Sequence, residues 1–69
     1  MIRVQELVNT DYDENSFRIS AFADTKEEVT SSATFEGLPE GAKIEIGSSV
    51  LTAKGEVAFM KSDGTWSWV

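Results

Sequence analysis

Residues with the chemistry to bind a metal ion lie close together early in the chain. Asp11, Asp13 and Asn15 alternate with other residues, as oxygen ligands do at the start of the helix-flanked loops that bind calcium. The pattern then fails, because Ser16 stands where such a loop requires glycine and Phe22 stands where it requires a bidentate glutamate. We therefore predict a solvated loop between two strands and no metal site.

Groups able to carry out catalysis are scarce. The chain has no histidine and no cysteine, which excludes Ser–His catalysis, cysteine catalysis and thiolate metal sites. Carboxylate pairs such as Glu27 and Glu28 are present, but general acid–base catalysis needs a carboxyl group in a dry pocket with a shifted pKa. A domain of 69 residues rarely encloses one. The composition predicts a protein that is not an enzyme and binds no cofactor.

Acidic residues dominate the charge of the chain. The net charge is −6 and the sequence pI is about 4.3. Residues 1–40 hold nine acidic and three basic residues, whereas residues 41–69 hold three of each. We therefore expect no contact with nucleic acid or with a membrane, because both would need a basic patch to neutralise phosphates. The neutral C-terminal segment is the better candidate for contact with a protein.

Targeting segments are not evident. No apolar run approaches the ~18 residues that a membrane span requires, and residues 1–6 lack the long apolar region of a secretory signal. We expect synthesis in the cytosol.

Short alternating segments predict an all-β fold in a single domain, residues 1–69. Apolar and polar residues alternate in each segment, as is typical of strands with one buried face. These segments are residues 2–8, 17–23, 33–36 and 43–46. The first two are joined by a loop rich in Asn, Asp and Ser, which predicts a hairpin. Between the second and third, Thr25 and Glu28 have capping-box spacing, which predicts at most one helical turn or a tight polar turn.

The last third of the chain predicts a three-stranded antiparallel meander. Lys54-Gly55 and Asp63-Gly64 are turn signals, and they separate three short segments of apolar and β-branched residues. Together with the upstream strands, this favours a small antiparallel sandwich or barrel.

The length of the two meander loops is open, and it decides which side chains share a face. With two-residue loops, Val50, Phe59 and Trp68 line up across the three strands and Lys61 faces Trp66. We favour this register slightly, because it sets a cation beside an indole and an aromatic ring beside a β-branched residue. With three-residue loops and a glycine bulge, both indoles instead share a face with Ala58 and Met60.

Aromatic side chains are the candidates for a protein interface. Trp66 and Trp68 lie two residues apart and project from one face of a strand. They either cap the core or anchor an interface. Phe59 and Tyr12 complete the set of interface candidates. A domain this small buries only about 60% of its unfolded-chain surface, so either a compact core suffices or a partner completes the burial. We expect a homo-oligomer.

The C-terminal half resembles a group of viral proteins. The segments Gly47–Val50, Gly55–Phe59 and Ser62–Trp66, with Glu36–Gly41 upstream, are similar to the endings of small virion-associated structural proteins of tailed phages and prophages of Firmicutes. The resemblance implies a non-enzymatic particle component, located in the virion or the host cytoplasm.

Two functions follow as hypotheses. In the first, the protein is a phage or prophage structural protein that self-associates or attaches to a capsid or tail protein. In the second, it is a small acidic inhibitor that presents the carboxylates of residues 1–40 to a basic surface of a host protein. An acidic contact weakens steeply with ionic strength, whereas an apolar contact does not.

Overall fold

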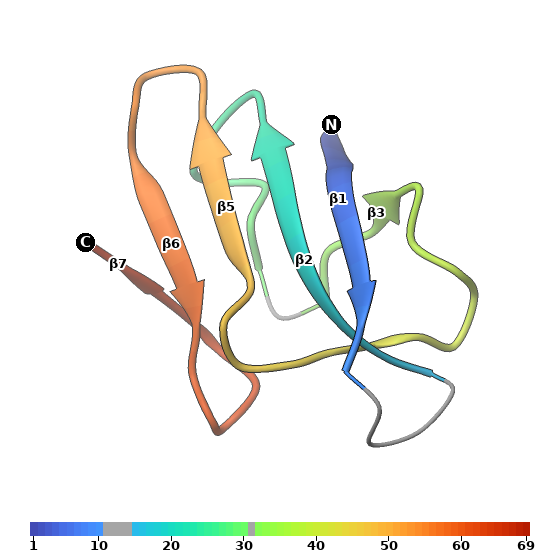
Figure 1. Cartoon of the computed structure of the whole chain (residues 1–69). Coiled ribbons are helices and arrows are strands. Elements are labelled where there is room, and N and C mark those ends of the chain that lie inside the picture. Colours follow the sequence, from blue (N-terminus) through green and yellow to red (C-terminus); the bar gives the residue numbers. More distant parts are fainter. Residues whose placement is uncertain (11–14, 31) are drawn as a thin grey trace.

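The computed structural model describes residues 1–10, 15–30 and 32–69. The described part of the chain contains seven strands and no helix (Figure 1). The strands are β1 (Ile2–Asn9), β2 (Ser16–Ala23), β3 (Phe35–Glu36), β4 (Lys43–Ile44), β5 (Ser49–Thr52), β6 (Val57–Met60) and β7 (Trp66–Trp68). The all-β prediction is confirmed. The predicted loop ligands Asp11 and Asp13 lie outside the described residues.

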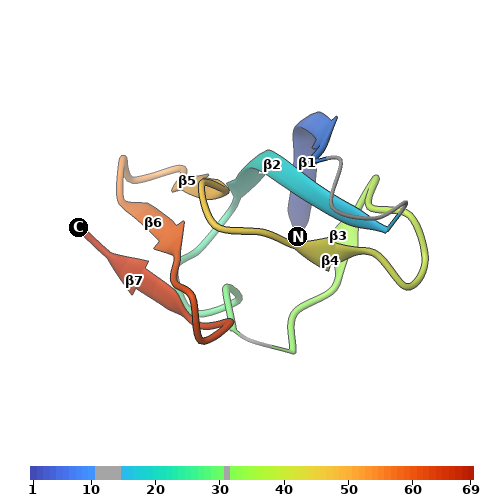
Figure 2. The same ribbon diagram turned by 60° about the horizontal axis from the view of Figure 1, so that its bottom comes forward.

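All seven strands belong to one mixed sheet. The order is β3-β1-β2-β5-β6-β7, and β4 pairs with β2 beside β5. The predicted hairpin β1–β2 and meander β5–β6–β7 are antiparallel. The pairs β1–β3, β2–β4 and β2–β5 are parallel. The sheet curves strongly without closing into a barrel (Figure 2).

The parallel pairs follow from the long connection after β2. Parallel neighbours require a connection that returns to the end of the sheet where the first strand began. Residues 24–48 make this return, and on the way they add the two-residue strands β3 and β4 to the sheet. The sheet is therefore mixed rather than purely antiparallel.

One face of the sheet carries the core, and we call it the inner face. Apart from Phe35, the side chains of its core cluster are small or β-branched, which suits a domain with little volume to fill. The core cluster is Ile2, Ile19, Ala21, Ala23, Val29, Phe35 and Val50. Val29 belongs to the segment after β2, so part of that segment covers the inner face. Among the described residues, no comparable core cluster lies on the opposite, outer face of the sheet.

Ser48 fixes the entry into β5. Its side chain is fully buried, and its Oγ accepts a hydrogen bond of 2.9 Å from the backbone N–H of Ile19. Its carbonyl oxygen accepts the N–H of Met60 at 3.1 Å. Ser48 therefore joins β2 through its hydroxyl and β6 through its backbone carbonyl, at the end where the long connection rejoins the sheet.

Glycine bulges set the register of the meander. Gly55 and Gly64 are the third residues of their loops and have φ angles of +86° and +84°. Thr52 N–H donates to the Glu56 carbonyl at 2.8 Å, which closes the first loop. The second loop is closed by the Lys61 N–H, which donates to the Thr65 carbonyl at 2.9 Å.

The favoured two-residue loops are therefore wrong, and the three-residue alternative is correct. Trp68 pairs with Ala58, and Trp66 pairs with Met60. Burial explains the outcome, because this register points both indoles to the inner face beside buried Ala58 and Met60. Phe59 instead pairs with Ser67 on the outer face.

Replacing Gly64 tests the bulge. A Cβ at this position meets no atom within 4 Å, so Gly64→Ala adds only the strain of a left-handed backbone. We expect a loss of about 1–2 kcal/mol in the free energy of unfolding, measured by urea titration. Gly64→Asn should lose less, because asparagine tolerates this conformation. Equal stability of all three proteins would contradict the bulge.

Candidate functional site

The two tryptophans complete the inner face. Both are half-buried and pack against the core. The Trp66 ring lies 5.9 Å from the Phe35 ring, centroid to centroid, in a tilted arrangement. The Lys26 ammonium lies 5.1 Å from the centre of the Trp68 ring, within cation–π range. The indoles therefore hold the segment after β2 against the edge of the sheet.

The other predicted interface residues lie elsewhere. Phe59 lies on the outer face with 47% of its surface exposed, so the sheet separates it from both indoles. Tyr12 lies outside the described residues. The structure therefore brings together Trp66 and Trp68 but not the predicted set as a whole.

Phe59 belongs to a partly exposed apolar group on the outer face that the sequence alone did not predict. We call this group the outer patch; it consists of Phe22, Leu51, Val57 and Phe59. Phe22 pairs with Leu51, and Leu51 pairs with Val57, so three strands contribute to one surface. Leu51 is 44% exposed. A signal was present, because Leu51, Val57 and Phe59 alternate with buried residues, but the wrong register concealed it.

The outer-face positions next to the outer patch on β2, β5 and β7 carry no charge, and Arg18 of β2 lies one position further along the strand. The positions beside the outer patch on β2, β5 and β7 are serines: Ser20, Ser49 and Ser67. Depletion of charge together with aromatic enrichment is the compositional mark of the core of a protein–protein interface.

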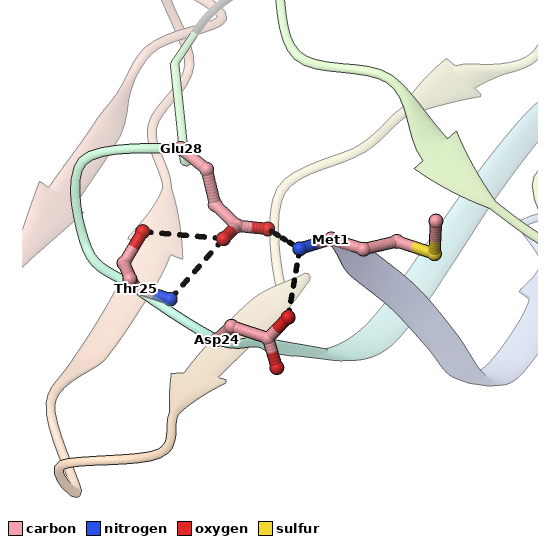
Figure 3. Close-up of polar contacts among 4 residues, drawn as sticks. All are labelled: Met1, Asp24, Thr25 and Glu28. Carbon is pink, nitrogen blue, oxygen red and sulfur yellow. Dashed lines mark hydrogen bonds and ion pairs between the residues drawn. The ribbon is translucent and has the colours of Figure 1, made fainter.

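A second cluster lies at the beginning of β1 (Figure 3). The Met1 ammonium is 2.9 Å from Asp24 Oδ2 and 2.5 Å from Glu28 Oε1. Glu28 Oε2 accepts hydrogen bonds of 3.2 Å from both the N–H and the hydroxyl of Thr25. The cluster ties the first strand to the turn after β2. This turn is the predicted tight polar turn, closed by the Val29 N–H on the Lys26 carbonyl at 3.1 Å.

The ion pairs shift the pKa of each member of the cluster. The hydrogen bond from the Met1 ammonium lowers the pKa of Asp24 and of Glu28. The same hydrogen bonds, first from Glu28 and then from Asp24, raise the pKa of the Met1 amine. A general acid at neutral pH needs a raised carboxyl pKa, so Glu28 is electrostatically unsuited to that role. The cluster borders a shallow cavity of about 560 Å³ lined by Met1, Ile2, Glu28, Thr34 and Glu36.

The described residues do not form a metal-binding group or a membrane-spanning helix. Among the described residues, no three His, Cys, Asp or Glu side chains gather as a metal-binding group. In the same part of the chain, no helix has the length and apolar character needed to cross a bilayer. No protein-family model, curated protein or solved structure matches this chain. The outer patch is therefore the surface on which a functional proposal can be built.

The ion cluster predicts a pH-dependent stability. Carboxyls with lowered pKa stabilise the fold above their unfolded values, 3.8 for Asp24 and 4.5 for Glu28, and this is lost as pH falls through the folded values. The amine of Met1, raised above 8.0, stabilises below that pH and ceases to do so as pH rises through its folded value. We expect the melting temperature to be highest between these limits. Glu28→Gln should flatten the profile, and Glu27→Gln should not.

Core and surface aromatics predict different losses of stability. Trp66→Ala removes a half-buried ring from the core and should lower the free energy of unfolding by about 1–3 kcal/mol. Phe59→Thr, on the outer face, should change it by no more than about 0.5 kcal/mol. Urea unfolding followed by circular dichroism measures both. A larger loss for Phe59→Thr would contradict the assignment of faces.

Proposed function

We propose that this protein is a non-enzymatic structural protein of a phage or prophage. It acts by self-association or by attachment to a capsid or tail protein, and the outer patch makes the contact. The observation that carries the proposal is the uncharged apolar sheet surface formed by exposed Leu51 and Phe59 together with half-buried Phe22 and Val57. Apolar surface gathered in this way on a small domain is a common mark of a protein-binding site.

The character of the surface suits a structural contact. Transfer of apolar area from water gives roughly 25 cal/mol per Å², and this contribution persists at the salt concentrations that screen ion pairs. A strand-based platform also holds its side chains at fixed positions, which reduces the entropy lost on binding. The resemblance of the C-terminal segments to virion-associated proteins supports placing this contact in a particle.

The acidic-inhibitor hypothesis has less support. An inhibitor of that kind presents free carboxylates to a basic partner. Asp24 and Glu28, which belong to the acidic residues 1–40, are both engaged by the Met1 ammonium. Part of the negative charge in this half of the chain is therefore neutralised within the molecule.

Particle composition tests the proposal. We expect mass spectrometry to detect the chain in purified particles induced from the strain that encodes it. A Leu51→Glu variant should be lost from the particles while remaining folded by circular dichroism, because it buries a charge in the contact. Ser62→Glu adds the same charge in an exposed loop and should be retained. Absence of the unmodified chain from particles would reject the proposal.

A salt titration separates the two hypotheses. Binding to a particle protein through the outer patch should hold as ionic strength rises. Binding that falls steeply with salt, together with full retention of Leu51→Glu, would instead favour the acidic inhibitor.

A further inference from the structure

Side chains on the outer face form two rows that run across the strands. The pairing registers of β1, β2, β5, β6 and β7 define both rows. The first row is Glu6, Ser20, Ser49, Phe59 and Ser67. The second row is Arg3, Phe22, Leu51 and Val57. The rows are adjacent and parallel, and each crosses the strands in the same order.

Each row carries one charge, and both charges are on β1. Glu6 pairs with Ser20, and Arg3 pairs with Phe22; both charged residues are exposed. The remaining positions of both rows are serine or apolar. The two rows thus have opposite charges side by side at the β1 margin and no charge on β2, β5, β6 or β7, and Arg18 of β2 lies beyond the first row.

The sizes of the side chains in the two rows are complementary. On β2 and β5 the first row has serine, whereas the second row has the larger Phe22 and Leu51. On β6 the relation reverses, because the large Phe59 is in the first row and the smaller Val57 is in the second. Laid over each other, the two rows would place small residues against large ones and Glu6 against Arg3.

A twofold axis produces this superposition. An axis that lies in the interface, perpendicular to the strands and between the rows, places the first row of one copy over the second row of another. The contact is isologous, so the Arg3–Glu6 pairing occurs twice. An axis parallel to the strands instead places the charges of β1 over β7 and leaves them without partners. Charge complementarity therefore selects the perpendicular axis.

We infer that the outer face binds a second copy of this chain in this arrangement. The inference rests on the proposed function, whose contact surface it uses, and it names the partner. Each molecule has a net charge of −6, so two copies repel one another overall and can meet only through a surface that avoids this charge. The outer face lets two such molecules meet without opposing like charges.

The geometry of packed sheets allows the charge pairs to form. Packed sheets cross at about 30°. If the two sheets cross at β5, the β1 strands lie two strands, or about 10 Å, from the crossing point, and each is displaced from the other by roughly 5 Å. An arginine side chain spans that shift. The area is small, on the order of 300–400 Å² per copy against about 800 Å² in a standard interface, and β7 curves away from it (Figure 2). The dimer is therefore weak in solution and is reinforced where copies are held together.

Charge reversal with mixing tests the arrangement. Arg3→Glu alone opposes two pairs of carboxylates, and Glu6→Arg alone opposes two pairs of cations. Each variant should dimerise at least ~10-fold more weakly than the parent at low salt. An equimolar mixture should regain the parental affinity, because both pairs in the heterodimer are then of opposite charge. Sedimentation equilibrium from micromolar to millimolar protein measures all four samples.

The mixture also controls for effects within one molecule. Each variant has the same structure alone and in the mixture, so a local disturbance of β1 would weaken dimerisation in both. Recovery of the parental affinity in the mixture therefore reports the charge pairs between copies. Circular dichroism verifies that both variants fold, and Leu51→Glu should abolish the dimer. A strictly monomeric parent, or variants that dimerise as the parent does, would overturn the inference, as would a mixture that shows no recovery. A monomeric parent that is still present in particles would reject the dimer alone, whereas a dimer absent from particles would reject the proposed function alone.

Discussion

The pairing register of β5, β6 and β7 is the constraint on which the rest of this structure depends. Because side chains alternate across a strand, a shift of one residue would exchange the two faces of the sheet. Gly55 and Gly64 fix the register by adopting left-handed backbone conformations in three-residue loops. Both indoles consequently point inward, and Phe59 points outward. The same pairing register therefore determines both the core and the outer patch.

The inner face is closed by contacts of several kinds. Val29 supplies a buried apolar side chain from the segment after β2, and Lys26 lies over the Trp68 ring. The Met1 ammonium joins Asp24 and Glu28 on the same segment (Figure 3). A thin core gains stability from such polar contacts around its margin, because few large apolar side chains are available within it. No such contacts cover the outer face within residues 1–10, 15–30 and 32–69.

The difference between the covered inner face and the outer face supports a binding role, and it indicates no particular chemical reaction. In the described part of the chain, one side of the sheet is covered by the segment after β2, whereas the other carries exposed Leu51 and Phe59 and half-buried Phe22 and Val57. Domains are usually built from two packed layers, and a second copy or a particle protein would supply the missing layer. The proposal rests on the outer face and on the resemblance of the C-terminal segments.

The sequence by itself determined the local features of this protein. Alternation predicted the β1–β2 hairpin, the spacing of Thr25 and Glu28 predicted a tight turn, and glycine positions predicted the meander. These features depend on residues that are close together in the sequence, so the sequence alone predicts them. The tertiary structure decided the loop register and the parallel pairing of β5 with β2. It also decided which apolar residues form a surface. The buried face is set by the side chains of all the strands together, and the long connection brings strands that are distant in the sequence side by side.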